Sequence, residues 1–267
     1  MSAPPLTSVN NPRIKAVGAL QTNSRMRRRQ GLFVIEGRRE ITMAIDAGYT
    51  IETLFYCPEA GATGDLPAHL SPTAGVRVAK PVFDRIAYRE NSDGLLAIAQ
   101  AKEHAIDSLN LPPRPIIIVA EAVEKPGNLG AILRTADAAG IDALIVCEPV
   151  TDIYNPNVVR ASLGCLFTQQ IALCSSPQAL AWLRANNLRI YAAELLASQW
   201  YHQTDFTVPC AIAVGAEATG LSSFWLRHAD ARIKIPMRGR VDSLNVSVST
   251  AVLAFEAIRQ RTMNDER

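Results

Sequence analysis

The chain has 267 residues with 27 basic and 25 acidic side chains, a net charge of +2, so bulk charge does not mark it as a nucleic-acid binder. Its hydrophobic content of 48% is enough for real cores, and its length accommodates two domains. The longest apolar run, Ile116–Ala120, is too short to cross a bilayer, and no signal peptide is visible. We therefore expect a soluble, cytoplasmic protein without a membrane partner.

The five cysteines and four histidines are scattered along the chain. None has the C-x-x-C or His-pair spacing that is typical of zinc sites, and the odd number of cysteines argues against a disulfide framework. We therefore predict no metal site.

The basic residues concentrate at the N-terminus, where residues 1–40 contain eight Lys or Arg against two Glu. Ser24–Gln30 holds four arginines and no acid. Such a run is typical either of a solvated surface or of a phosphate-binding one, and both interpretations stay open.

The first hundred residues predict a small α/β module. Asn11–Gln21 has a helical pattern, and Arg38–Gly48 predicts a helix that stops at its glycine. The expected strands are 31–36, 51–56 and 94–100, with a short strand at 76–79 and a helical turn at 81–87. Residues 105–115 contain three prolines in four positions and are interpreted as a linker between domains 1–104 and 116–267.

Beyond the linker, strands and helices alternate, which predicts an α/β domain with a parallel sheet. Ile116–Glu121 is continuously apolar, as expected for a strand covered on both faces. The further expected strands are 143–147, 167–173, 189–193, 210–214 and 232–235, and the expected helices are 128–140, 157–164, 177–186 and 243–261.

Three segments of this domain combine glycine with polar residues. In Glu124–Gly140, Asn128 is a candidate helix N-cap. Arg134 could be a surface or ion-pair residue of the helix, but its apolar neighbours lead us to expect that it is buried and needs an anionic partner. In Gly215–Leu221, Glu217 could cap backbone amides or pair with Arg134. In Ile235–Ser249, Ser243 could cap the last helix. A dinucleotide-binding loop is disfavoured because G-x-G-x-x-G is absent.

Together with Y-N-P-N-V-V-R-A-S-L-G-C-L-F at 154–167, these segments resemble the motifs of the SpoU-type (TrmH-like) RNA ribose 2′-O-methyltransferases of the SPOUT superfamily. F-V-I-E-G-R-R-E at 33–40 resembles the start of the ribosomal-protein-like substrate-binding domain often found in front of them. The resemblance implies an S-adenosylmethionine-binding parallel-sheet domain with a deep trefoil knot, an obligate homodimer and an RNA substrate. The two-domain layout favours large-subunit rRNA over tRNA.

The resemblance also assigns site residues. Its polar catalytic set corresponds to Asn128, Arg134, Glu217, Ser243 and Asn245, and the cofactor would lie against the backbone at Leu195, Gly215, Ile235 and Leu244. We expect RNA contacts from Arg13, Arg25, Arg27, Arg28, Arg29 and Arg38 in the first domain, and from Arg160 near the site. Two alternatives keep the fold: a tRNA methyltransferase and a non-catalytic RNA-binding assembly factor.

Overall fold

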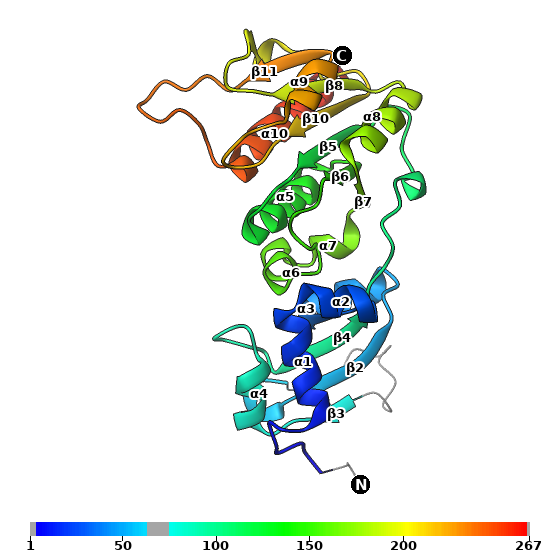
Figure 1. Cartoon of the computed structure of the whole chain (residues 1–267), viewed down its shortest axis with the longest axis vertical. Coiled ribbons are helices and arrows are strands. Elements are labelled where there is room, and N and C mark those ends of the chain that lie inside the picture. Colours follow the sequence, from blue (N-terminus) through cyan, green and yellow to red (C-terminus); the bar gives the residue numbers. More distant parts are fainter. Residues whose placement is uncertain (1–3, 63–74, 266–267) are drawn as a thin grey trace. The chain divides into compact units, whose positions relative to one another are not determined.

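The computed structural model describes residues 4–62 and 75–265 and divides into two compact units (Figure 1). Unit 1 comprises Met1–Glu103 together with Asp152–Thr168, and unit 2 comprises His104–Thr151 together with Gln169–Arg267. The first division, at residue 103, falls next to the predicted linker. Residues 152–168 pack with unit 1, although they lie within the predicted C-terminal domain in sequence.

Unit 1 is built on a four-stranded sheet in the order β1-β4-β2-β3. The β1/β4 and β2/β4 pairs are antiparallel, and β2/β3 is parallel. Its strands are β1 (Leu32–Glu36), β2 (Ile51–Tyr56), β3 (Gly75–Arg77) and β4 (Leu95–Gln100), and its first helices are α1 (Pro12–Thr22), α2 (Ser24–Gln30), α3 (Arg38–Asp46) and α4 (Lys80–Ile86).

Local sequence explains where the first helices begin and end. The Asn11 side chain accepts a hydrogen bond from the Arg13 amide (2.9 Å), and Asn23 does the same for Met26 at the start of α2 (3.0 Å). Gly31 ends α2 in the left-handed conformation, with φ of 64°. Val17 and Leu20 of α1 then pack against Phe55 and Leu96 of the sheet.

The segment 152–168 belongs to unit 1 because of its aromatic side chains. It contains α6 (Pro156–Ser162) and α7 (Cys165–Thr168), so the strand predicted at 167–173 is wrong at its start. The Tyr154 ring lies 4.2 Å from that of Phe33 (between centroids), and Phe167 lies 5.1 Å from Tyr49. The Tyr154 hydroxyl accepts a hydrogen bond from the Lys102 amide (3.0 Å). Burial raises the pKa of Tyr154.

Unit 2 contains a seven-stranded sheet in the order β7-β6-β5-β10-β8-β11-β9. Every neighbouring pair is parallel, which confirms the predicted α/β class. The strands are β5 (Ile116–Glu121), β6 (Ala143–Cys147), β7 (Ile171–Cys174), β8 (Arg189–Ala193), β9 (Gln199–Trp200), β10 (Cys210–Val214) and β11 (Ala231–Lys234). The helices are α5 (Pro126–Ala139), α8 (Ser176–Ala185), α9 (Ser223–His228) and α10 (Val246–Asp265).

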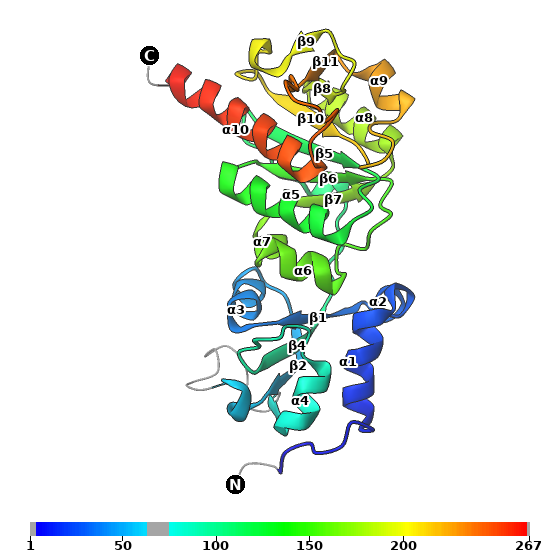
Figure 2. The same cartoon turned by 90° about the vertical axis from the view of Figure 1, so that its left-hand side faces the viewer.

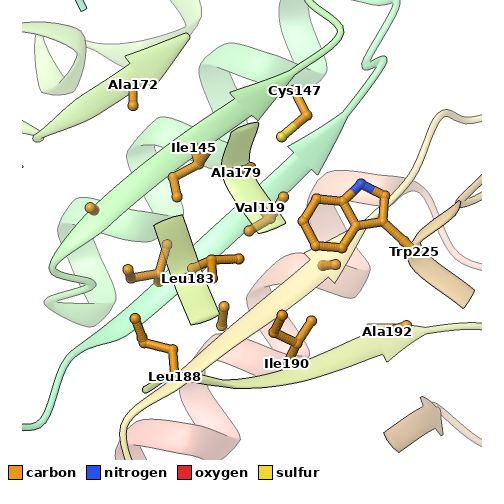
Figure 3. Packing of buried hydrophobic residues seen from close by; sticks show 14 of the residues in the cluster. Val119, Ile145, Cys147, Ala172, Ala179, Leu183, Leu188, Ile190, Ala192 and Trp225 are labelled. Atoms are coloured by element: carbon orange, nitrogen blue, oxygen red, sulfur yellow. The ribbon is translucent and has the colours of Figure 1, made fainter. Parts of the chain in front are cut away.

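Helices cover both faces of this sheet. On one face, Leu183 of α8 and Trp225 of α9 pack against alternate strand residues such as Val119 and Ile190 (Figure 3). On the other face, α5 and α10 lie side by side (Figures 1 and 2). β5 is buried throughout, which explains why its sequence is a continuous apolar run rather than an alternating one.

In residues 4–62 and 75–265, no helix is both long and apolar enough to cross a membrane. No cluster of three or more His, Cys, Asp or Glu there could hold a metal ion, and His69 lies outside those ranges. The five cysteines are all free, and Cys174 is the one that is not fully buried.

Candidate active site

A cleft with a volume of about 410 Å³ opens at the edge of the unit 2 sheet where β8, β10 and β11 end. Its walls come from residues 193–196, 214–221 and 233–235, and from the segment that leads into α10. In parallel sheets the carboxyl ends of the strands share one edge, which is where ligands bind in this class of fold. The four predicted cofactor residues all line this cleft: Leu195, Gly215, Ile235 and Leu244.

The loop after β10 is folded tightly back on itself. The Gly220 amide donates to the carbonyl of Ala216 (2.9 Å), and Gly220 has φ of +69°. A Cβ at Gly215 would overlap the backbone of Gly220 and Leu221. Gly215 is therefore required for closure of the loop itself, apart from any role in letting a ligand approach its backbone.

A chain of side-chain hydrogen bonds joins the three polar segments found in the sequence. Asn128 Nδ2 donates to Glu217 Oε1, and Asn245 Nδ2 donates to Asn128 Oδ1 (3.1 Å). Asn245 Oδ1 in turn accepts from the amide and the hydroxyl of Ser247 (2.9 and 2.7 Å). A carboxylate only accepts hydrogen bonds, so Glu217 fixes which way both amide groups point.

Glu217 also caps the backbone before α5. It accepts from the amides of Glu124 (3.3 Å) and Lys125 (3.4 Å), which is the first of its two predicted roles. Partial burial acts to raise the pKa of Glu217. The hydrogen bonds from the Asn128 side chain and from backbone amides outweigh burial, so that its pKa lies below the ordinary value.

Two predicted helix caps are wrong. α5 begins at Pro126 rather than at Asn128, because proline suits the first helical position, so Asn128 is the third residue of the helix. α10 begins at Val246, and the residue whose side chain caps it is Asn245 rather than Ser243. Ser243 is exposed in the wall of the cleft, and its hydroxyl has no hydrogen-bond partner in the ranges that the structure covers.

Arg134 is exposed, so the prediction that it is buried is wrong. Residues adjacent in sequence are about 100° apart around a helix, and α5 buries Ile132, Leu133 and Ala136 while Arg134 points outward. Asn128 lies six residues earlier, about 240° around the same helix, and faces Glu217. The described residues contain no ion pair between Arg134 and Glu217.

The predicted RNA-contacting arginines divide into two kinds. Arg27 must be removed from the set: it is 4% exposed and pairs with Asp152 (2.7 Å), and its guanidinium also donates to the Leu20 carbonyl (2.6 Å). Its position on the inward side of α2 gives it a structural role. The exposed residues are Arg13, Arg25, Arg28, Arg29 and Arg160, and Arg38 is half-buried.

Sequence reasoning missed Glu121, the buried acid at the end of β5. Its carboxylate accepts from the amide and hydroxyl of Ser222 (2.7 Å each) and from the Ser176 hydroxyl (3.1 Å). It thereby anchors the end of the loop that carries Glu217. A charged residue closing an otherwise apolar strand was the available signal.

Comparisons with known proteins show which family the chain resembles. The model of the SpoU rRNA Methylase family matches residues 115–255, and that of the MRM3-like substrate binding domain matches 11–97. A 23S rRNA (uridine(2479)-2′-O)-methyltransferase of Streptomyces viridochromogenes is 29% identical over 94% of this chain and 91% of its own.

Two solved structures extend the likeness to nearly the full length. An RNA 2′-O ribose methyltransferase has a TM-score of 0.85 at 38% identity, over 97% of this chain and 100% of its own. An AdoMet-bound rRNA methyltransferase from Sinorhizobium meliloti has a TM-score of 0.85 at 31% identity, over 96% and 97%. With the family model matching more than half of the residues, this chain belongs to the SpoU rRNA methylase family.

Proposed function

We propose that this protein transfers the methyl group of S-adenosylmethionine to a ribose 2′-hydroxyl in structured RNA, with large-subunit ribosomal RNA as the substrate. The observation that carries the proposal is the hydrogen-bonded chain from Glu217 through Asn128 to Asn245, which joins the polar motifs of the family near a cleft. Support for the substrate comes from relatives named as 23S rRNA 2′-O-methyltransferases.

The cleft suits S-adenosylmethionine. Its volume lies in the range of small-molecule pockets, and its walls offer backbone groups at strand ends beside apolar side chains. Gly215, Ile235, Leu244 and Leu195 would hold the cofactor, which supplies an electrophilic methyl group on a sulfonium. The remaining task of the protein is to bring the ribose hydroxyl into line with that methyl.

The chain's own residues would provide this alignment. Asn245 is held between Asn128 and Ser247, so its position at the start of α10 is fixed before substrate arrives. The lowered pKa of Glu217 keeps its carboxylate ionised at neutral pH, which preserves the orientation of the chain. The exposed Ser243 hydroxyl is available to bind the ribose or the cofactor.

Arg134 would act in the cleft of a second copy. On α5 it points to solvent, away from the Glu217 network of its own chain. On the neighbouring α10, Val248 and Phe255 are 47% and 50% exposed and lie seven residues apart, on one side of the helix. We infer a homodimer through this surface, in which Arg134 binds the target phosphate or stabilises the developing alkoxide.

Three finer inferences accompany this function. The C-terminal segment would pass through a loop as a deep trefoil knot, as the family resemblance implies. A ribosomal RNA substrate would place the protein in the cytoplasm. The exposed Arg25, Arg28 and Arg29 of α2 would bind RNA phosphates, so the affinity for RNA should fall steeply as salt is raised.

Transfer of labelled methyl from S-adenosylmethionine to total bacterial RNA tests the reaction. We expect label in the large ribosomal RNA, recovered as a 2′-O-methylated ribose. Label in tRNA alone would keep the chemistry and overturn the substrate. RNA binding with no label in any fraction would favour the assembly-factor alternative.

Complementation tests the shared site. Arg134→Ala and Asn128→Ala should each be inactive, whereas their co-expression should restore about a quarter of wild-type activity. Half of the dimers would then be mixed, and each mixed dimer would have one intact site and one doubly defective site. If Arg134 acted in the cleft of its own chain, every site would have one defect and no activity would return.

A further inference from the structure

The F-V-I-E-G-R-R-E motif of unit 1 builds a rigid turn whose purpose the methyl-transfer site does not explain. Glu36 is 8% exposed, and its carboxylate accepts the backbone amides of Tyr88 (2.7 Å) and Arg89 (3.3 Å). Glu40 is 2% exposed and pairs with the Arg89 guanidinium. Burying two carboxylates is costly unless each is fully paired, so the turn at 88–89 is held firmly.

The glycine between the two acids is part of this arrangement. Gly37 has φ of +105°. A Cβ at this position would overlap the Glu40 carboxylate and would lie 2.9 Å from Nη1 of Arg89. The motif therefore brings an acid, a glycine and a second acid together around one arginine. Its effect is to fix the backbone that presents Tyr88.

The Tyr88 side chain is exposed and lies near a basic residue of another element, Arg160 of α6. Tyr88 is 40% exposed, and it borders a small hollow that is also lined by Arg89 and by the exposed Arg160. Neither the Tyr88 hydroxyl nor the Arg160 guanidinium has a hydrogen-bond partner in the described ranges. The hollow, of about 20 Å³, has room for a water molecule and not for a base.

We propose that Tyr88 and Arg160 form a nucleotide-binding subsite of unit 1, at which an unpaired base of the RNA stacks on the Tyr88 ring and a neighbouring phosphate contacts Arg160. The ligand class rests on the proposed function. An exposed aromatic ring held by a fixed backbone provides a stacking surface with little entropy to lose, and RNA is mainly recognised through such unpaired bases. Because the hollow is too small for a base, the base lies across its mouth.

Binding of in vitro-transcribed 23S rRNA by the full chain tests the subsite, with Tyr88→Ala, Tyr88→Phe and Arg160→Ala compared over a series of salt concentrations. Tyr88→Ala should weaken binding about tenfold, or about 1.4 kcal/mol, with an unchanged salt slope, because stacking releases no ions. Tyr88→Phe should bind within about twofold of wild type. Arg160→Ala should reduce the slope by about one.

The matched control is Arg85→Ala, which removes an exposed arginine from the last turn of the nearby α4. In the double variant Arg85→Ala/Tyr88→Ala, the Tyr88→Ala substitution should weaken RNA binding by the same factor as it does in the wild-type background. A photochemical arm uses 23S rRNA containing 5-iodouridine, for which a cross-link to Tyr88 is expected if the stacked base is a uridine or has one beside it. Thermal unfolding of each variant checks that this exposed position does not affect the fold.

The outcomes separate the subsite from the methyl-transfer function. Normal RNA affinity in Tyr88→Ala, or an equal loss in Tyr88→Phe, would overturn the subsite even if wild type methylates rRNA. A Tyr88-dependent affinity in a wild-type protein that transfers no methyl would keep the subsite and overturn the function. A wild-type protein that binds no RNA would overturn both, and would suggest that Tyr88 contacts protein.

Discussion

Replacing Glu121 tests whether the buried acid at the end of β5 holds the cleft together. Glu121→Gln can keep its hydrogen bonds, because its oxygen can accept the Ser222 amide while its NH₂ donates to the hydroxyls of Ser222 and Ser176. Glu121→Gln should therefore lower the free energy of unfolding by only about 1 kcal/mol. Glu121→Leu loses three hydrogen bonds to a charged acceptor, and because Ser222 is exposed enough to bind water we expect about 3 kcal/mol.

Thermal unfolding followed by tryptophan fluorescence measures this loss in unit 2, because Trp182, Trp200 and Trp225 all lie there. A loss of 3 kcal/mol should lower Tm by about 6–12 °C, and Glu121→Leu should also weaken S-adenosylmethionine binding in a calorimetric titration. The control is Glu148→Gln, an exposed acid at the neighbouring strand end that accepts from the Ser176 amide (2.8 Å); it should change stability by less than about 0.5 kcal/mol. The anchoring role is refuted if Glu121→Leu has the Tm of wild type, or if Glu121→Gln has a Tm as low as that of Glu121→Leu.

Three further predictions follow from the site and the basic helix. Arg27→Ala should destabilise unit 1 by about 3 kcal/mol in urea without changing the salt slope of RNA binding, whereas Arg28→Ala should reduce that slope by about one. Because the pKa of Glu217 is lowered when folded, the stability advantage of wild type over Glu217→Gln should be complete above pH 4.5 and decline as pH falls through the lowered pKa; an advantage independent of pH would contradict this. Arg134→Lys should reduce turnover at least about tenfold at unchanged RNA affinity, since near-normal turnover would exclude a specific guanidinium role.

Most of the fold of unit 2 was predictable from the sequence, although the short elements β9 and α9 were not predicted. The apolar run of β5 and the glycine that ends α5 at residue 140 both behave as their residue types dictate. The cleft could be expected too, since parallel strand ends meet at one edge.

The exposure of the Arg134 side chain was not predictable by the same reasoning. Its apolar neighbours in sequence suggested burial, but burial on a helix depends on angular position, and the side that faces away from the sheet is set by how α5 packs beside α10. Arg27 shows the converse. The four arginines within five positions of α2 look alike in sequence, and the one that is internal is paired with Asp152, 125 residues away.

The 154–167 motif shows how family patterns can mix packing and function. Tyr154 packs on Phe33, Asn155 caps α6 by accepting from the Asn157 amide (2.9 Å), and Val158 and Val159 are buried. These roles account for most of the pattern through the stability of unit 1 alone. Arg160 is the charged member that packing leaves unexplained, because it is exposed without a hydrogen-bond partner in the described ranges. A polar residue that a structural motif holds outward is a better candidate for a ligand contact than the motif as a whole, which is why we assign RNA contact to Arg160 and not to its neighbours.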